Sequence, residues 1–278
     1  MTSQLKTGVL LALLSGIILF LGYTFGGSTG LVFAFVLALG MNVGSYWYSD
    51  KIVLRMYRAQ EVTPAQSPML HTMVGELAQN AGIPMPRVYI IPDSTPNAFA
   101  TGRNPEHAVV AVTEGILKIL SPDELRGVIA HEIGHITNRD ILIQSIAGVL
   151  GSVIMTVANF ALFFGGGRSD EENSSPFVGI LVALFAPIAA SLIQFAISRS
   201  REYLADETGA RLCGKPLALA SALGKLTASN QQQPMHEGGP ATAHLFIVNP
   251  FSGAGAARLF STHPPVEERI ARLRAMAS

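Results

Sequence analysis

Charged residues are spread unevenly along the chain, and the first long stretch without them covers residues 7–49. A membrane-spanning helix needs about 20 apolar residues, so this stretch has room for two. The turn-forming sequence GGSTG at 26–30 divides them, which predicts spans at about 8–25 and 31–48. A cleaved signal peptide would also place Lys6 before an apolar segment. However, a second span follows at once and no A-x-A pattern closes the first, so we expect both spans to be retained.

Two later stretches, 141–167 and 173–198, are also free of charge. The polar sequence RSDEENSSP at 168–176 separates them, so they predict a second hairpin with spans at about 141–165 and 177–198. The chain then divides into an N-terminal hairpin (1–49), a polar part (50–140), a second hairpin (141–198) and a polar C-terminal part (199–278).

Basic residues near the ends of the spans indicate their orientation, because such residues favour the cytoplasmic side. The hairpin loops offer only Arg168, which three acidic residues follow closely. The basic residues on the other side are Lys51, Arg55, Arg58, Arg126, Arg139, Arg199 and Arg201. We therefore expect both polar parts and both termini to lie in the cytoplasm.

Composition supports a membrane protein. Charged residues make up 14% of the chain, hydrophobic residues 49%, and the mean hydropathy is +0.38. Soluble domains carry about 25% charged residues. The formal net charge of zero gives no indication of a nucleic-acid partner. Cys213 is the only cysteine, so a metal site in this chain must be built from His and carboxylate ligands.

The polar parts show the signals of a mixed helical and stranded domain. Residues 67–83 have helical periodicity, with Pro near the start and Gly near the end. Three short apolar runs separated by Pro, Gly and Asn predict strands at 87–91, 97–101 and 107–112. Residues 199–278 are mostly helical, apart from a loop at 238–255.

A second helix is predicted at about 123–140, and its start is well defined. Ser121 fits the N-cap, Pro122 the first helical position and Glu124 the third, which together form a capping box.

This helix carries the sequence HEIGH. His131 and His135 are four residues apart and lie on one helical face, about 6 Å apart along the axis, so both rings can bind one ion. Glu132 is offset by about 100° and can reach a water at that ion without being a ligand. The H-E-x-x-H spacing is typical of zinc hydrolases in which the Glu is the general base. Such sites use three protein ligands, so one remains to be found.

Topology selects Glu202 as the third ligand. The second hairpin begins six residues after His135 and ends four residues before Glu202, so it returns the chain to the same membrane face beside the two histidines. Asp206, one turn later, could accept a hydrogen bond from a ligating histidine. Alternatively, both acids could simply solvate a helix that also carries several arginines, but an acid so near hydrocarbon needs a partner.

These motifs together resemble the HtpX family of bacterial membrane zinc metalloproteases, relatives of the CAAX prenyl proteases. The resemblance rests on HEIGH, on SREYLAD at 200–206, on TPNAFATG at 95–102 and on STHPPVEERI at 261–270. It implies a mainly α membrane protein with four transmembrane helices and a cytoplasmic α+β zincin-like protease domain carrying a small β-sheet. It also implies one Zn²⁺ per chain, bound by His131, His135 and Glu202, with Glu132 as catalytic base.

The resemblance further implies an endopeptidase of the bacterial inner membrane, acting in stress response and quality control. Its substrates would be misfolded or damaged membrane proteins, and other membrane quality-control proteases are possible partners. Two alternatives remain, a non-catalytic membrane scaffold with a structural metal site and a CAAX-type prenyl-protein processing protease.

Other candidate residues each have two possible roles. His263 could stabilise the oxyanion, or it could cap the helix that begins near Pro265. Asn97, Ala98 and Phe99 could form an edge strand that pairs with an extended substrate, or a plain strand. Asp140 could support the metal site, but we expect it to mark the membrane interface.

Overall fold

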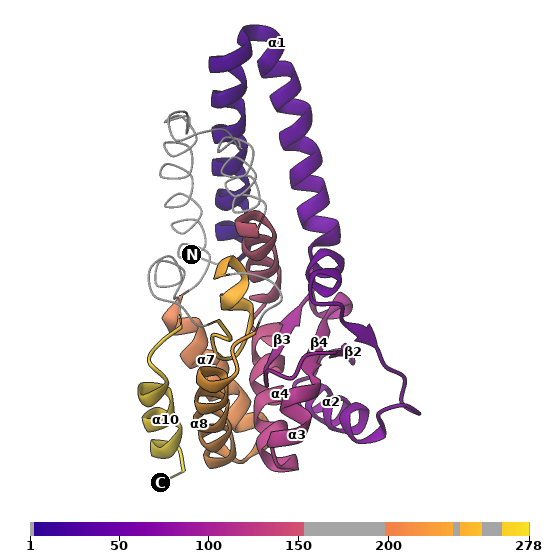
Figure 1. The fold of residues 1–278 in the computed structure, drawn as a ribbon, viewed down its shortest axis with the longest axis vertical. Coiled ribbons are helices and arrows are strands. Elements are labelled where there is room, and N and C mark those ends of the chain that lie inside the picture. The colour runs from indigo at the N-terminus through magenta and orange to yellow at the C-terminus, as the bar shows by residue number, and fades with distance from the viewer. Residues whose placement is uncertain (1–2, 153–197, 236–239, 252–262, 278) are drawn as a thin grey trace, which may run out of the picture.

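The computed structural model describes residues 3–152, 198–235, 240–251 and 263–277. Its longest element, α1 (Ser3–Met56), is a helical hairpin bent at Gly27, whose φ of 57° and ψ of −142° lie outside the helical region. Both arms project away from the rest of the molecule (Figure 1). Asn42 Nδ2 donates to Ser15 Oγ across the hairpin at 2.9 Å. The turn that GGSTG predicted is thus made at Gly27.

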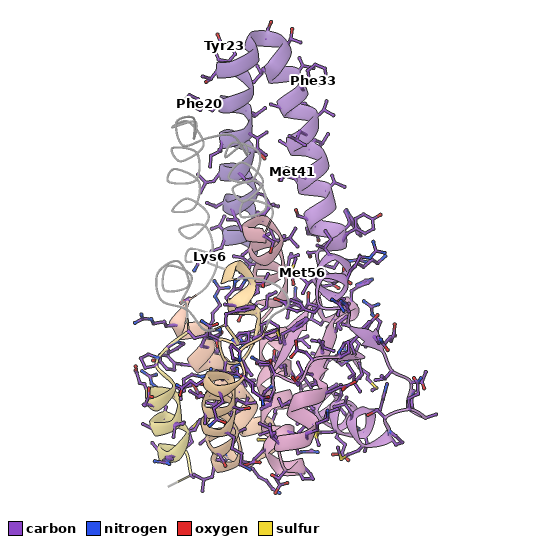
Figure 2. All side chains as sticks on the ribbon, viewed as in Figure 1. Lys6, Phe20, Tyr23, Phe33, Met41 and Met56 are labelled. Carbon is purple, nitrogen blue, oxygen red and sulfur yellow. The ribbon has the colours of Figure 1, made fainter. Side chains whose placement is uncertain are left out.

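Both arms of α1 are long and apolar enough to cross a membrane, over Leu5–Thr24 and Gly26–Met56. Their large apolar side chains point outward, as Phe20, Tyr23 and Phe33 do in Figure 2, with exposed fractions of 61–75%. Lipid is the environment that such side chains favour. The two N-terminal spans predicted from the sequence therefore agree with the structure in position and character.

Four spans are not confirmed. The third predicted span begins as a helix, Ile141–Ser152, but most of its side chains are buried against the protein. Residues 153–165 of the third predicted span and 177–197 of the fourth lie outside the described residues. Within the described part of the chain, two helices fit a membrane crossing.

A four-stranded mixed sheet lies below α1, in the order β1-β2-β4-β3. The strands are β1 (Gln60–Glu61), β2 (Arg87–Ile91), β3 (Ala98–Thr101) and β4 (Val109–Thr113). β2 pairs parallel with β4, while β3 and β1 pair antiparallel with their neighbours. The three strands predicted from the sequence are confirmed to within two residues. β1 was missed because two residues show no periodicity.

Helices pack around this sheet (Figure 1). α4 contacts α7, α8, α2 and β3, and its middle residues are all buried. Its central position explains why apolar residues surround the HEIGH sequence. The elements are α2 (Pro68–Asn80), η1 (Pro105–His107), α3 (Glu114–Ile119), α4 (Pro122–Thr137), α7 (Arg199–Cys213), α8 (Pro216–Gln232), η2 (Pro240–Leu245) and α10 (Val266–Ala275).

The capping box at the start of α4 is confirmed. Glu124 accepts a hydrogen bond from the Ser121 amide at 2.8 Å, and the Ser121 side chain accepts one from the Glu124 amide. The same carboxylate also accepts hydrogen bonds from Ser221 Oγ at 2.7 Å and Lys225 Nζ at 2.8 Å, both on α8. Burial would raise the pKa of Glu124, but the bonds from Lys225, Ser221 and Ser121 lower it to about 2. Glu124 thus links α4, in the first polar part of the chain, to α8 in the second.

Loss of this carboxylate should destabilise the fold. Because its pKa is lower in the folded protein, Glu124 contributes stability above its ordinary pKa of 4.5, and this is lost as the pH falls toward 2. We expect Glu124→Gln to lower the free energy of unfolding by about 1–3 kcal/mol near neutral pH, with a smaller deficit in acid. Thermal denaturation of the detergent-solubilised protein measures this. The exposed Glu114→Gln is the control, and equal behaviour of the two variants would refute the expectation.

Candidate metal centre

Helices α4 and α7 approach each other unusually closely, because a glycine stands on each side of the contact. A Cβ added at Gly209 of α7 would lie 2.7 Å from the His131 amide nitrogen. One added at Gly134 of α4 would lie 3.0 Å from the Ala205 carbonyl oxygen. Larger residues at these positions would separate the helices. Gly134 and Gly209 are thus needed for this packing, although glycine disfavours a helix interior.

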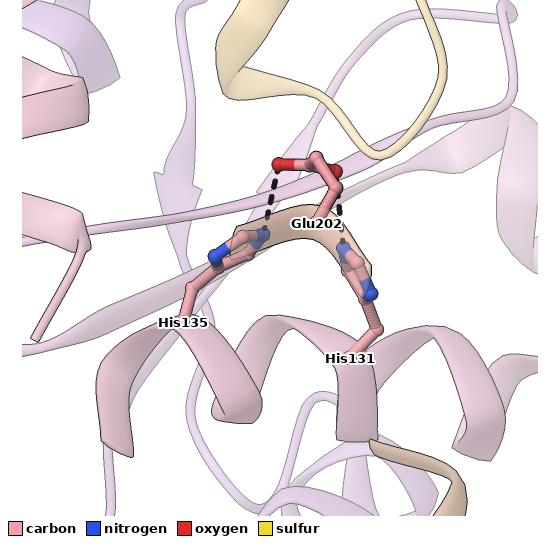
Figure 3. A group of neighbouring side chains, drawn as sticks. All are labelled: His131, His135 and Glu202. Atoms are coloured by element: carbon pink, nitrogen blue, oxygen red, sulfur yellow. Dashed lines mark ion pairs between the residues drawn. The ribbon is translucent and has the colours of Figure 1, made fainter. Parts of the chain in front are cut away.

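This contact brings His131, His135 and Glu202 together, as Figure 3 shows. Glu202 Oε2 lies 3.8 Å from His131 Nε2, and Glu202 Oε1 lies 3.5 Å from His135 Nε2. One donor atom from each residue lies within 4.8 Å of the others, and all three residues are buried. Bonds of about 2.0 Å to a tetrahedral Zn²⁺ place ligand atoms roughly 3.3 Å apart. The two distances from Glu202 to the histidines are slightly longer than that value.

The electrostatics of the three residues suit a cation. Complete burial lowers the pKa of His131 to about 4, so its ring is neutral near pH 7. Burial also opposes protonation of His135, but the negative charges of Glu202 and Asp140 raise its pKa to about 9. Burial disfavours ionised Glu202, yet His263 and His135 hold its pKa well below the usual range. The carboxylates that attract a proton to His135 would equally attract a metal ion.

Asp206 supports His131 from the side opposite Glu202. Its Oδ1 lies 2.9 Å from His131 Nδ1, as the sequence suggested. Arg269 of α10 binds both Asp206 oxygens, at 2.7 and 2.8 Å, and also donates to the Ile247 carbonyl oxygen at 2.7 Å. Burial would raise the pKa of Asp206, but Arg269 lowers it to about 2. The His131 nitrogen that faces away from Glu202 therefore contacts a buried ion pair.

Arg269 was not among the residues predicted from the sequence, and Asp140 lies at a different place from the one we expected. Arg269 belongs to an amphipathic helix that carries several arginines, so nothing local distinguishes it from its exposed neighbours. Asp140 is buried, with Oδ2 3.7 Å from His135 Nδ1 and Oδ1 3.3 Å from Arg201 Nη1. We expected Asp140 to mark the interface, whereas the structure places it beside the second histidine. Its position directly after the motif was the signal that favoured this role.

Glu132 lies on the same helix and is buried in the site. The Ala100 amide of β3 donates a hydrogen bond to its carboxylate. Burial raises the pKa of Glu132 to about 7, and Glu202 adds to this while His135 opposes it. A carboxyl group with such a pKa can both accept and release a proton near neutral pH.

The residues present fit a metal ion. Within the described part of the chain, His131 Nε2 and Glu132 Oε1 are buried and have no hydrogen-bond partner. Buried polar atoms without partners are costly, and a ligand is one way to satisfy them. Two imidazoles and one carboxylate are the ligand set of several zinc hydrolases.

His263 lies at the edge of this group. Its Nδ1 is 3.2 Å from Glu202 Oε2, and its Nε2 is 3.4 Å from the Ala243 carbonyl oxygen. Pro265 occupies the N-cap of α10 without a side-chain hydrogen bond, so His263 is not the cap of that helix. The structure thus places His263 in contact with Glu202, one of the three candidate metal-binding residues.

Residues 97–99 lie beside the site, but their outer edge is covered. The Thr113 amide donates a backbone hydrogen bond to the Asn97 carbonyl oxygen. In an antiparallel pair every second residue forms such bonds, so Phe99 also bonds β4 through its backbone. The peptide groups of Ala98 and Ala100 therefore point away from β4, toward the outer edge. The Ala98 carbonyl oxygen accepts from the Ile247 amide at 3.1 Å, and Asn97 Nδ2 donates to the Val248 carbonyl oxygen at 2.6 Å. Residues 247–248 thus occupy the edge expected for substrate.

Comparison with known proteins agrees with these features. Residues 64–277 match the family model described as Peptidase family M48. A "Protease HtpX homolog" of Syntrophobacter fumaroxidans is 60% identical, over 99% of this chain and 100% of the relative. Another of Pyrococcus furiosus is 58% identical, over 98% and 95%. The crystal structure of S. mikatae Ste24p shares the fold, with a TM-score of 0.53 and 18% identity over 97% of this chain. This chain spans 65% of that structure's length.

Enlarging Gly209 should weaken metal binding. In Gly209→Ala the new methyl group would meet the α4 backbone at His131, so α7 and Glu202 must move away. We expect the affinity for Zn²⁺ to fall by about 10-fold or more, measured by competition with a chromophoric chelator. Gly224→Ala is the matched control, because its methyl group would meet only Ile270 Cδ1 at 4.0 Å. Unchanged affinity in a folded Gly209→Ala protein would contradict this account.

Proposed function

The chain belongs to peptidase family M48 and is a metalloprotease, and from this premise we propose that it is a zinc-dependent endopeptidase of a biological membrane. The observation that carries the proposal is the convergence of His131, His135 and Glu202 beside the buried carboxyl group of Glu132. We assign the three convergent residues to zinc binding and Glu132 to general base catalysis. A non-catalytic scaffold would have no use for a carboxyl group with a pKa near 7 at this position.

The mechanism follows from what the residues can do. His131, His135 and Glu202 would hold Zn²⁺, which would supply the Lewis acidity that makes water nucleophilic near neutral pH. Glu132 accepts the proton of the attacking water and then transfers it to the leaving amine. The Ala100 amide, which donates to the Glu132 carboxylate, holds this group in place during both transfers. Asp206 fixes the orientation of the His131 ring.

His263 is our candidate for stabilising the negative charge on the carbonyl oxygen of the substrate. Its proximity to Glu202 supports this role, although its ring must release the Ala243 carbonyl or Glu202 to contact substrate. For substrate binding we propose main-chain pairing along residues 97–99, which suits unfolded segments of varied sequence. Such pairing requires residues 247–248 to leave the edge of β3.

Substrates and location complete the proposal. We propose that misfolded or damaged membrane proteins are cleaved on the cytoplasmic side of the plasma membrane, as part of quality control and stress response. The apolar hairpin α1 supports a membrane location, because it would hold the site close to such substrates. CAAX-type processing is a weaker candidate, since no feature of the described residues points to a prenylated peptide.

Replacing the general base should separate binding from catalysis. We expect Glu132→Gln to retain zinc while losing cleavage of an unfolded membrane protein by about 100- to 10,000-fold. Metal analysis of the purified protein and a gel-based cleavage assay test the two parts. Glu207→Gln, at a half-buried position on α7 that pairs with Arg211, is the control and should behave as wild type. Full cleavage by Glu132→Gln would exclude the proposed mechanism.

Removal of the metal provides an independent test. We expect a chelator to abolish cleavage, and one equivalent of Zn²⁺ per chain to restore it, because the ligands form a single site. Cleavage that persists without metal would favour a scaffold whose observed activity comes from a contaminant.

The orientation can be tested at Arg168, which lies outside the described residues. A reporter fused there should be active on the side of the membrane opposite to the site, because basic residues near the other span ends favour the cytoplasm. A fusion at the C-terminus is the control and should report the cytoplasm. A cytoplasmic signal at Arg168 would overturn the proposed four-span topology.

A further inference from the structure

Aromatic and basic side chains gather around a hollow where the second arm of α1 meets the sheet, away from the metal centre. The hollow has a volume of about 490 Å³, and Trp47, Tyr48, Lys51, Arg87, Arg103 and His107 are among the residues that line it. Trp47 is the only tryptophan of the chain and is 49% exposed. The hollow thus lies at the end of an apolar helix, where aromatic residues commonly meet the membrane surface.

Two cations in this hollow lie over aromatic rings. The Arg103 guanidinium lies 4.5 Å from the centroid of the Trp47 ring, and Lys51 Nζ lies 5.3 Å from that of Tyr48. Neither forms an ion pair with a carboxylate among the residues that the structure describes. Asp50 also lines the hollow but is bound to Arg87 at 3.1 Å, and Glu106 contributes one further negative charge. Basic side chains thus outnumber acidic ones around the hollow, so its net charge favours binding of an anion.

Arg103 is held in place by its surroundings. Its Nη2 donates a hydrogen bond to His107 Nε2, and His107 Nδ1 in turn bonds Asn104 Oδ1 at 2.7 Å. Gly102, with a φ of 135°, turns the chain so tightly that a Cβ there would lie 2.5 Å from the His107 carbonyl oxygen. A guanidinium fixed over an aromatic ring is a preformed partner for a phosphate group.

An exposed apolar stripe leads from this hollow along the membrane-facing arm. Val43 and Leu39 precede Trp47 by four and eight residues, so the three side chains share one face of the helix. Their exposed fractions are 49%, 55% and 49%. A soluble phosphate would contact only the cations, whereas a lipid would place its acyl chain along the stripe.

From this arrangement we propose that the hollow binds the phosphate headgroup of an anionic phospholipid, between Arg103, Lys51 and Trp47. The inference rests on the membrane location proposed above and is independent of the protease mechanism. Bound lipid would hold the loop that carries Arg103 at the bilayer surface. This loop continues directly from β3, whose Ala100 amide bonds Glu132.

Fluorescence of Trp47 can test the proposal directly, because no other tryptophan contributes. The full chain is reconstituted in phosphatidylcholine vesicles that contain a small fraction of brominated lipid, which quenches nearby indole rings. We expect brominated phosphatidylglycerol to quench Trp47 several-fold more strongly than the same fraction of brominated phosphatidylcholine. Arg103→Gln and Lys51→Gln should each reduce this ratio toward one. Arg126→Gln, a basic residue paired with Glu76 elsewhere, is the control and should preserve it.

Other outcomes would overturn the proposal in recognisable ways. Equal quenching by both lipids would indicate ordinary boundary lipid, and a preference that survives both substitutions would place the anion elsewhere. If inorganic phosphate abolishes the preference at millimolar concentration, the hollow binds soluble anions rather than lipid. Quenching by neither lipid would place Trp47 outside the bilayer. Cleavage of unfolded protein, assayed in the same vesicles, reports separately on the metalloprotease.

Discussion

The close approach of α4 and α7 is the constraint on which the site depends. Gly134 and Gly209 allow the two helices to touch through their backbones, and this contact sets the distance between Glu202 and the two histidines. A buried carboxylate and two imidazole rings then share one small volume, and a charge buried there needs a partner of opposite sign. Packing of two helices thus brings together three groups that could bind one metal ion.

A second layer of buried charge connects this centre to the rest of the molecule. Arg269 donates to the two Asp206 oxygens through Nε and Nη2, and it donates to the Ile247 carbonyl oxygen through Nη1. Arg269 therefore connects α10 to the segment over β3 directly, and to His131 through Asp206. Removal of either charge would leave the other buried without a partner, which is more costly than loss of the pair. The geometry of the site is consequently tied to elements far apart in the sequence.

The sheet edge and the membrane-facing hairpin set the surroundings of this centre. β3 contributes the Ala100 amide to Glu132 on one side and continues into the loop of Arg103 on the other. Residues 247–248 cover its outer edge in this structure. One short strand therefore lies next to the Glu132 carboxyl group, the edge covered by residues 247–248 and the junction with α1. Its central role is not apparent from its length.

The sequence by itself determined the local features. Long charge-free runs determined the hairpin of α1. Short apolar runs bounded by Pro, Gly and Asn determined the three longer strands, and Ser121 with Glu124 determined the start of α4. The spacing of HEIGH placed His131 and His135 on one face, because helical geometry depends only on neighbouring residues. Tertiary structure decided what depends on distant contacts: the burial of Asp140, the pairing of Arg269 with Asp206, and the covering of β3 by residues 247–248. Each of these joins side chains through packing, which local spacing does not encode.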